Sequence, residues 1–268
     1  MKKRFAVIGV GNMAKSIIAG ITSADVAVSS FYLFDKFTAA CDCYKDKNGF
    51  YIEKDIATVV ENADCVLLSV KPQNYSEILA EIKQVKDFDK KLYISIGAGI
   101  TSQSVSQELG GANVIRVLPN LPMTIGMGAS VICKNDNVSK EDFAFVESVF
   151  ASSGSITIID ESDMNTIIGV TSSSPAYVFK FINAIYMGAK AQGLNTEGLL
   201  DIICDVVIGS AALLKQSTDT PTDLISKVAS KGGTTEQALI KLNEGKFDKI
   251  IENAMIACTN RANELGKK

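Results

Sequence analysis

A short segment near the end of the chain has the residues of a binding site for a small carboxylate. A serine, a glycine pair and two threonines stand directly before an amphipathic helical pattern, namely Ser230, Gly232, Gly233, Thr234 and Thr235. The glycines leave backbone N–H groups open to close approach, a threonine can cap the helix, and Glu236 favours its positive end. Such a helix start holds an anion. The same residue types also suit a plain helix cap that touches no substrate, and the residues alone leave both readings open.

A second glycine-rich segment follows the first apolar run of the chain and carries the candidate cofactor residues Gly9, Gly11, Asn12, Met13 and Ala14. In a strand–turn–helix unit the first glycine permits a tight turn, the second lets a pyrophosphate approach the backbone, and the small third residue allows close helix packing. The pattern therefore predicts dinucleotide binding. Asp35 suits the ribose of NAD, whereas Lys36 suits the 2′-phosphate of NADP, so the choice between NADH and NADPH stays open.

Three further segments leave apolar runs at points where a parallel sheet places its ligand crevice. They contain Val70, Lys71 and Pro72, then Ala98 and Gly99, then Pro119 and Asn120. In a doubly wound sheet the carboxyl ends of the strands line the cofactor site. The two prolines of the third segment make it stiff enough to form a wall beside a nicotinamide. Taken singly, each segment is equally consistent with a solvated loop or a tight turn.

An alternation of short β-rich runs and helical patterns positions these segments in the first 160 residues. The runs are Arg4–Gly9, Phe31–Asp35, Cys65–Val70, Leu92–Ile96, Val114–Val117, Ser130–Cys133 and Ile156–Ile159. This rhythm indicates a parallel sheet with crossover helices, and several runs are apolar throughout, as in strands covered on both faces. We therefore expect an α/β fold, with a Rossmann-like doubly wound dinucleotide-binding domain over residues 1–162.

From Met164 onward the β pattern stops and long helical segments follow, namely Ala176–Gln192, Glu197–Gln216, Thr234–Asn243 and Lys246–Leu265. They predict an all-helical domain over residues 163–268. The first helix is apolar over much of its surface, which requires burial either against a second subunit or inside a single-chain bundle. The second carries Asp201 and Asp205 and is too short to span a bilayer, so we expect it to be packed.

Composition narrows the function further. The chain has 268 residues and a formal charge of −3 with well-mixed charges, which supports neither a nucleic-acid nor a membrane partner. Its six cysteines form no CxxC pair and there is no histidine, so no metal site is predicted and a cytoplasmic protein with reduced thiols is expected. A general acid must then be water, a hydroxyl, lysine, tyrosine or a carboxyl group, which excludes histidine-dependent mechanisms.

The motifs, taken in order, resemble those of the pyrroline-5-carboxylate reductase family over nearly the whole chain. They are the Gly9–Met13 turn, Val70–Pro72, Ser95–Ile100, Arg116–Pro122, Thr171–Tyr177 and Val228–Leu239. The last is the most specific. The resemblance implies NAD(P)H-dependent reduction of the cyclic imine 1-pyrroline-5-carboxylate to L-proline, the last step of proline biosynthesis.

The same resemblance implies roles for individual residues. The Thr235 hydroxyl is expected to bind the ring nitrogen, while Ser230 and the backbone around Gly233 and Thr234 hold the substrate carboxylate. The nicotinamide is expected near Ala98, Pro119 and Asn120. The resemblance also implies a C-terminal dimerisation domain and a homodimer with its site where the two domains meet at the dimer interface, often within a larger ring such as a decamer.

Four residues depart from the family's usual pattern: Leu121 replaces threonine, Ser172 and Ser174 replace glycine, and Lys231 stands where proline is common. Two alternatives therefore stay open. One is a related imine or β-hydroxyacid dehydrogenase with the same two-domain layout. The other is a non-catalytic regulatory protein that binds a nicotinamide cofactor without transferring hydride.

Overall fold

A computed structural model describes residues 2–267, and the chain divides into two compact units. Unit 1 contains residues 1–173 and 255–268, and unit 2 contains residues 174–254. The last helix is continuous across the second junction, so its final turns belong to unit 1. The boundary predicted from the sequence, between residues 162 and 163, marks the change from strand patterns to helical patterns. It is not defined by compact packing, and it stays a prediction.

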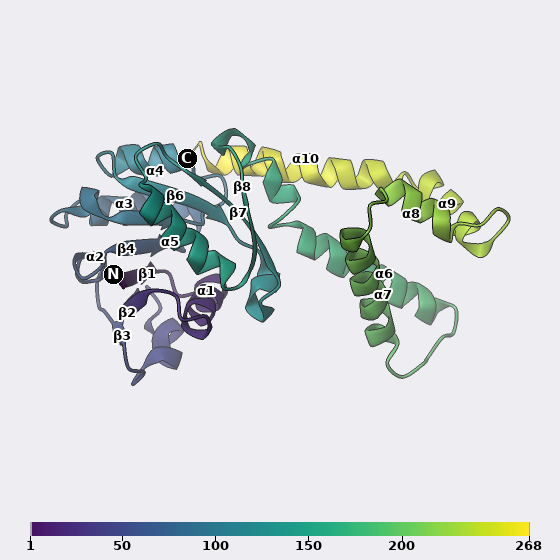
Figure 1. Cartoon of the computed structure of the whole chain (residues 1–268), viewed down its shortest axis with the longest axis horizontal. Coiled ribbons are helices and arrows are strands. Elements are labelled where there is room, and N and C mark those ends of the chain that lie inside the picture. The colour runs from purple at the N-terminus through teal and green to yellow at the C-terminus, as the bar shows by residue number, and fades with distance from the viewer. Residues whose placement is uncertain (1, 268) are drawn as a thin grey trace. The chain divides into compact units, whose positions relative to one another are not determined.

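Unit 1 is built on an eight-stranded sheet in the order β3-β2-β1-β4-β5-β6-β7-β8 (Figure 1). The strands are β1 (Lys3–Ile8), β2 (Val28–Phe34), β3 (Phe50–Ile52), β4 (Cys65–Leu68), β5 (Leu92–Ser95), β6 (Asn113–Leu118), β7 (Gly128–Lys134) and β8 (Gly154–Ile158). The first six are parallel, and their order reverses between β1 and β4. This is the doubly wound arrangement predicted from the sequence, with its switch point beside the glycine turn.

Helices cover both faces of this sheet, which explains why several of its strands are largely apolar. Along β1, Phe5 and Val7 pack with α1 (Asn12–Ser23) and α5 (Lys140–Ala151). Ala6 and Ile8 pack on the other face with α2 (Ile56–Glu61), α3 (Tyr75–Ile82) and α4 (Ser102–Glu108). The side chains of these four residues of β1 are fully buried. The two clusters fix the register of the sheet, and with it the edge where the strands end.

The end of the sheet differs from the expected all-parallel pattern. β7 runs antiparallel to β6, and β8 is parallel to β7. The connection from β6 to β7 contains only the short 3₁₀ helix η4 (Leu121–Ile125), which is too short for a crossover that would return the chain in parallel. The seven predicted strands are present. The short edge strand β3 was missed because only three residues pair with β2.

Unit 2 is entirely helical among the residues described. It contains α6 (Ser174–Ala191), α7 (Leu199–Gln216), α8 (Pro221–Val228), α9 (Thr234–Glu244) and the first turns of α10 (Phe247–Leu265). The short helix α8 was not predicted, although its start is well marked. Thr220 and Asp223 form a reciprocal capping box, and Pro221 occupies the first turn.

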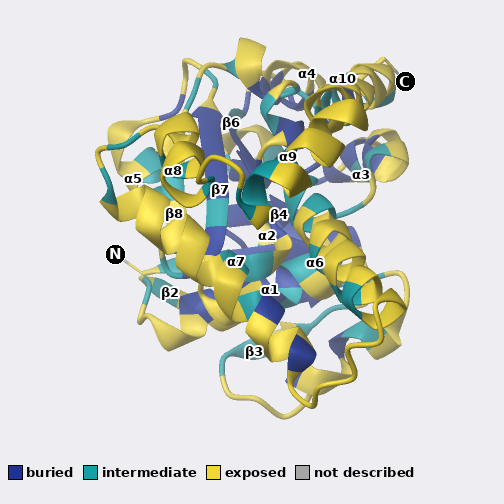
Figure 2. Ribbon diagram, turned by 90° about the vertical axis from the view of Figure 1, so that its right-hand side faces the viewer, coloured by how far each residue is buried: buried dark blue, intermediate teal, exposed yellow. Residues whose placement is uncertain are grey.

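The helices of unit 2 expose large apolar side chains, and Figure 2 colours much of these helices as exposed. No residue of α6 is buried, and Phe179 and Met187 are 55% and 57% exposed. On α7 only Leu199 and Ile203 are buried. The reading of α6 as the centre of a single-chain bundle is therefore wrong, whereas the expectation that α7 is packed stays a prediction. None of the helices between residues 2 and 267 is long and apolar enough to cross a membrane.

Candidate functional site

A cleft of about 500 Å³ lies at the switch point of the sheet, where the loops after β1, β2 and β4 meet. Six of the predicted cofactor residues line it, namely Gly9, Gly11, Asp35, Lys36, Val70 and Lys71. A crevice forms at this point because the connections that follow the two neighbouring strands lead to opposite faces of the sheet. The sequence motifs after β1, β2 and β4 are thus brought together in one place.

The two glycines of the turn fit a bound dinucleotide. Gly9 has a φ of +91°, and a Cβ there would lie 2.5 Å from the carbonyl oxygen of Ser69. Gly11 is the N-cap of α1, makes no side-chain cap and has open space where a Cβ would stand. The first N–H groups of α1 therefore face the cleft without a side chain over them, which suits a pyrophosphate.

The remaining residues of the turn do not line the cleft. Ala14 is fully buried within α1, Met13 packs against the core, and Asn12 is exposed and accepts a hydrogen bond from Ser16 at its backbone oxygen. Ala14 and Met13 thereby seat the helix on the sheet. Pro72 likewise opens the short 3₁₀ helix η2 (Pro72–Asn74) that leads from the cleft into α3.

Asp35 is fixed by the backbone at the end of β2. One carboxylate oxygen accepts from the N–H of Val10 at 2.7 Å and the other from the N–H of Phe37 at 2.8 Å. The side chain therefore ties the glycine turn to the second strand. Asp35 also lines the cleft beside Lys36. In doubly wound folds this position binds the adenosine ribose, so a formal negative charge is held there.

One wall of the cleft was missed by the sequence analysis. It comes from α3 and its N-cap and contributes Asn74, Glu77, Ile78 and Glu81. These positions recur at helical spacing after Lys71-Pro72, and that spacing was the signal available in the sequence. Two carboxylates thus join Asp35 in the lining, against the two ammonium groups of Lys36 and Lys71.

The loop after β5, which holds Ala98 and Gly99, is confined by its neighbours. The Tyr75 hydroxyl bonds Leu68 and Ser95 at 3.0 Å, and its ring lies where a Cβ on Gly97 would stand, 2.7 Å away. Gly99 has a φ of +81°. These residues lie at the same sheet edge as the glycine turn but outside the cleft lining.

The segment after β6 is held by polar contacts. The Asn120 side chain, 7% exposed, accepts from the N–H of Ala129 at 2.9 Å and donates to the carbonyl of Thr171 at 3.2 Å. The Ser172 hydroxyl donates to the carbonyl of Pro119 at 3.2 Å. Ser172, which replaces the family's usual glycine, therefore braces the segment. Leu121 is about half exposed, and nothing in the structure explains its replacement of threonine.

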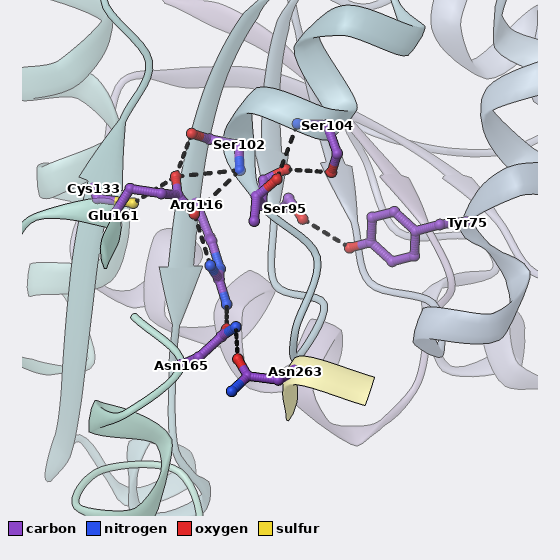
Figure 3. A network of polar contacts seen from close by, with 10 residues as sticks. Tyr75, Ser95, Ser102, Ser104, Arg116, Cys133, Glu161, Asn165 and Asn263 are labelled. Atoms are coloured by element: carbon purple, nitrogen blue, oxygen red, sulfur yellow. Dashed lines mark hydrogen bonds and ion pairs between the residues drawn. The ribbon is translucent and has the colours of Figure 1, made fainter. Parts of the chain in front are cut away.

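A buried ion pair stands beside these two loops (Figure 3). The Arg116 side chain lies within β6 and is fully buried; it donates to Glu161 at 2.7 Å and to Asn165 at 2.6 Å. Glu161 also accepts from the hydroxyl of Ser102 and from the thiol of Cys133. The cluster joins β6, β7, the start of α4 and the segment before α6.

The environment of Glu161 favours its ionised form. Burial by itself raises the pKa of this carboxyl, but the hydrogen bonds from Ser102 and Arg116 and the guanidinium charge outweigh it. The pKa of Glu161 therefore lies below its ordinary value. Asn165 in turn donates to Asn263 on α10 at 2.8 Å, which extends the cluster to the end of the chain. Of these residues, only Arg116 belongs to a motif that stands out in the sequence.

In unit 2, the predicted carboxylate-binding residues form one turn leading into α9. Gly232 has a φ of +75°, and its N–H donates to the Glu236 side chain at 2.7 Å. The Gly233 N–H donates to the carbonyl of Ser230 at 3.0 Å, and the Ser230 hydroxyl lies 2.6 Å from where a Cβ on Gly233 would stand. Lys231 is exposed.

The expectation that a threonine caps α9 is wrong. The N-cap is Gly233, and no side chain caps this helix. Thr234 and Thr235 lie inside the first turn, with Thr234 exposed and Thr235 half-buried. The first N–H groups of α9 and the Thr235 hydroxyl are therefore not engaged in a cap, which removes the structural explanation for the two threonines.

Two family models match the chain. Residues 161–265 match the model described as pyrroline-5-carboxylate reductase dimerisation, and residues 4–99 match the one described as NADP oxidoreductase, coenzyme F420-dependent. Unit 2 thus falls within a dimerisation domain. The glycine turn, Asp35, Lys71 and Ala98 fall within the oxidoreductase match.

Named relatives match over the full length. The chain is 32% identical to the pyrroline-5-carboxylate reductase of Aquifex aeolicus, over 99% of this chain and 97% of that protein. It is 31% identical to the enzyme of that name from Escherichia coli over 100% of both. A solved pyrroline-5-carboxylate reductase from Coxiella burnetii covers 100% of both chains at 29% identity, with a TM-score of 0.86.

A Plasmodium falciparum pyrroline carboxylate reductase, solved with NADP bound, covers 99% of both chains with a TM-score of 0.88, and at 24% identity it shows a shared fold. The family predicted from the motifs is confirmed by these matches. From its glycine turn to its last helix, the chain belongs to the pyrroline-5-carboxylate reductase family.

Proposed function

We propose that this protein reduces 1-pyrroline-5-carboxylate to L-proline with a reduced nicotinamide dinucleotide, as the last step of proline biosynthesis. The observation that carries the proposal is the start of α9. Its first N–H groups carry no side-chain cap, and Ser230 and Thr235 flank them. Full-length similarity to reductases of this name supports the assignment.

Substrate recognition begins with the carboxylate. The N–H groups of Thr234 and Thr235, next to Gly233, and the hydroxyl of Ser230 suit an anion at the positive end of α9. A Cβ at Gly233 would displace the Ser230 hydroxyl and crowd the Ser230 carbonyl. In this proposal the Thr235 hydroxyl binds the ring nitrogen of the imine, so that one helix turn holds both polar groups of the substrate.

The chemistry then makes few demands on side chains. The dinucleotide supplies a hydride to the imine carbon when bound. A cyclic imine that arrives protonated already has an electrophilic carbon, so the enzyme must orient it rather than donate a strong acid. A sequence without histidine is compatible with this role. Thr235 holds the protonated nitrogen in place during the transfer.

The cofactor residues divide into two groups. Gly9, Gly11, Val70 and Lys71 receive the dinucleotide at the cleft, with Asn12, Met13, Ala14 and Pro72 seating the surrounding backbone. Ala98, Gly99, Pro119 and Asn120 flank the nicotinamide. The amide of Asn120 is already occupied by backbone groups, so this residue acts by holding its segment in place.

We assign NADH as the preferred donor. The Asp35 carboxylate accepts two backbone N–H groups, which keeps it in the cleft, and Glu77 and Glu81 add further negative charge. A ribose hydroxyl can donate to Asp35, whereas a 2′-phosphate meets repulsion there. Lys36 moderates this repulsion without the planar fork that suits phosphate recognition.

The exposed apolar faces of α6 and α7 indicate a homodimer that buries them. Assembly into a larger ring such as a decamer is a further proposal, to be tested by light scattering. The free cysteines suit a cytoplasmic enzyme.

The carboxylate site is tested by comparing two substrates. Wild-type protein should oxidise NADH with 1-pyrroline-5-carboxylate at least about tenfold more efficiently, in kcat/KM, than with 1-pyrroline, which lacks the carboxylate. Charge-assisted hydrogen bonds contribute about 1.5–3 kcal/mol, which sets this factor. Equal efficiency with both imines would contradict the placement of the carboxylate at α9.

A further inference from the structure

We propose that the carboxyl end of α10, from Ala262 to Gly266, is a positioning element for the loop after β5, and so for the nicotinamide half of the cofactor. This inference rests on the proposed function, because that function places the nicotinamide beside Ala98 and Gly99. No sequence motif pointed to the end of the chain. The contact is visible only in the folded unit 1, where these final turns lie.

The backbone of the loop after β5 is in close contact with the backbone at the end of α10. A Cβ on Gly99 would overlap the carbonyl oxygen of Ala262 and lie 3.1 Å from the N–H nitrogen of Gly266. A Cβ on Gly266 would in turn overlap the carbonyl oxygen of Gly99. Neither neighbour is a flexible side chain, so any added atom must displace the loop or the helix end.

The helix end is itself anchored. Ala262 is 2% exposed and packs in a cluster with Leu118 and Met164, and Ala98 of the loop packs against the same cluster. Asn263 accepts from Asn165, which binds the buried Arg116. The end of α10 is therefore fastened to β6 through a polar chain and to the sheet edge through apolar contacts.

The loop is confined from its other side as well. Tyr75 fills the space next to Gly97 and bonds Ser95 at the end of β5. Gly97 abuts the Tyr75 ring at one end of the segment and Gly99 abuts the backbone of α10 at the other, so neither position has room for a Cβ. A shift of the helix end by about an ångström must then be passed to the loop, and displacements of that size at a reacting centre lower rates by up to about 100-fold.

Gly266→Ala is the sharpest perturbation, because the φ of Gly266 is not positive and the added methyl therefore acts only through its contact with Gly99. A second variant ends the chain at Ala262 and so removes Asn263 and Gly266 together. Glu264→Ala is the matched control, since this exposed side chain lies in the same final turns of α10 and forms an exposed ion pair with Arg261. Melting curves of all four proteins establish that each is folded.

The assay is isothermal titration of each protein with two ligands, NADH and ADP-ribose, which lacks the nicotinamide. Both test variants should bind NADH about tenfold more weakly than wild type while ADP-ribose affinity changes less than twofold, and kcat should fall by about tenfold. Glu264→Ala should leave both affinities and kcat unchanged. Loss of affinity that is equal for the two ligands, or no loss, would overturn the positioning role.

The wild-type titration separates this inference from the proposed function. If wild type binds NADH and turns over the imine while the variants keep the wild-type ratio of affinities, only the positioning role fails. If wild type does not bind NADH or NADPH, the proposed function fails and takes this inference with it.

Discussion

Replacement of Thr235 by alanine separates substrate binding from helix capping. The structure supplies a matched partner, because Thr220 is a true cap: its hydroxyl accepts from the N–H of Asp223 at 3.2 Å within a capping box. Thr235 caps nothing at the start of α9. The two substitutions remove the same hydroxyl and methyl groups from two helix starts in the same unit.

The expected magnitudes follow from these contacts. A hydrogen bond to a charged group contributes about 1.5–3 kcal/mol, so Thr235→Ala should lower kcat/KM for 1-pyrroline-5-carboxylate by roughly tenfold to 100-fold. Because no cap is lost, its melting temperature should stay within about 1 °C of wild type. Thr220→Ala should cost about 1 kcal/mol of stability, or roughly 2–4 °C, and leave kcat/KM unchanged.

The assay pairs steady-state NADH oxidation with melting curves at one fixed protein concentration, since the stability of a dimer depends on concentration. Thr235→Ser keeps a hydroxyl and should recover most of the activity, whereas Thr235→Val keeps the shape and should not. The reasoning is refuted if Thr235→Ala lowers the melting temperature as Thr220→Ala does while its kcat/KM stays within twofold of wild type.

Three further predictions concern unit 1. Arg116→Met should destabilise the protein by about 3–5 kcal/mol in denaturant unfolding, because it leaves the half-buried Glu161 without its guanidinium partner; a loss under about 1 kcal/mol would contradict the account of this ion pair. The lowered pKa of Glu161 means that its stabilising contribution is present above its unfolded pKa of about 4.3 and is lost as pH falls through the folded value. The melting temperatures of wild type and Glu161→Gln should therefore converge between about pH 5 and pH 3, and a constant gap would exclude this linkage. Asp35→Asn should shift the NADPH-to-NADH ratio of kcat/KM towards NADPH by about tenfold, as removal of one charge near a phosphate requires, and an unchanged ratio would leave Asp35 with only its backbone role.

The helices and strands in which apolar residues recur at a regular spacing could be predicted from the sequence. Seven strands and the four long helices were found because apolar residues recur with strand or helix spacing. The reversal at β7 was missed because direction depends on the length of the connection, not on the composition of the strand. The short helix α8 was missed because eight residues are too few to show a clear helical spacing of apolar residues.

The residues of the candidate site could be picked out of the sequence at the positions where the backbone conformation requires a particular residue type. Gly9, Gly99 and Gly232 each have a positive φ, and this is what makes their motifs visible. The anchor Asn165–Asn263 and the contact of Gly266 with Gly99 could not be predicted, because they join segments far apart in the chain through residues with no pattern of their own. The apolar surface of α6 was recognised in the sequence, but the choice between a second subunit and a single-chain bundle was left open there, because it depends on whether the chain buries that surface.

The central claim is most directly tested by following hydride transfer to its product. Purified protein is incubated at neutral pH with 1-pyrroline-5-carboxylate and either NADH or NADPH deuterated at the transferable position, and the product is identified by mass spectrometry. The account predicts L-proline carrying one deuterium at the former imine carbon, formed in step with cofactor oxidation and faster with NADH. A folded protein that binds the dinucleotide yet forms no labelled proline would contradict it.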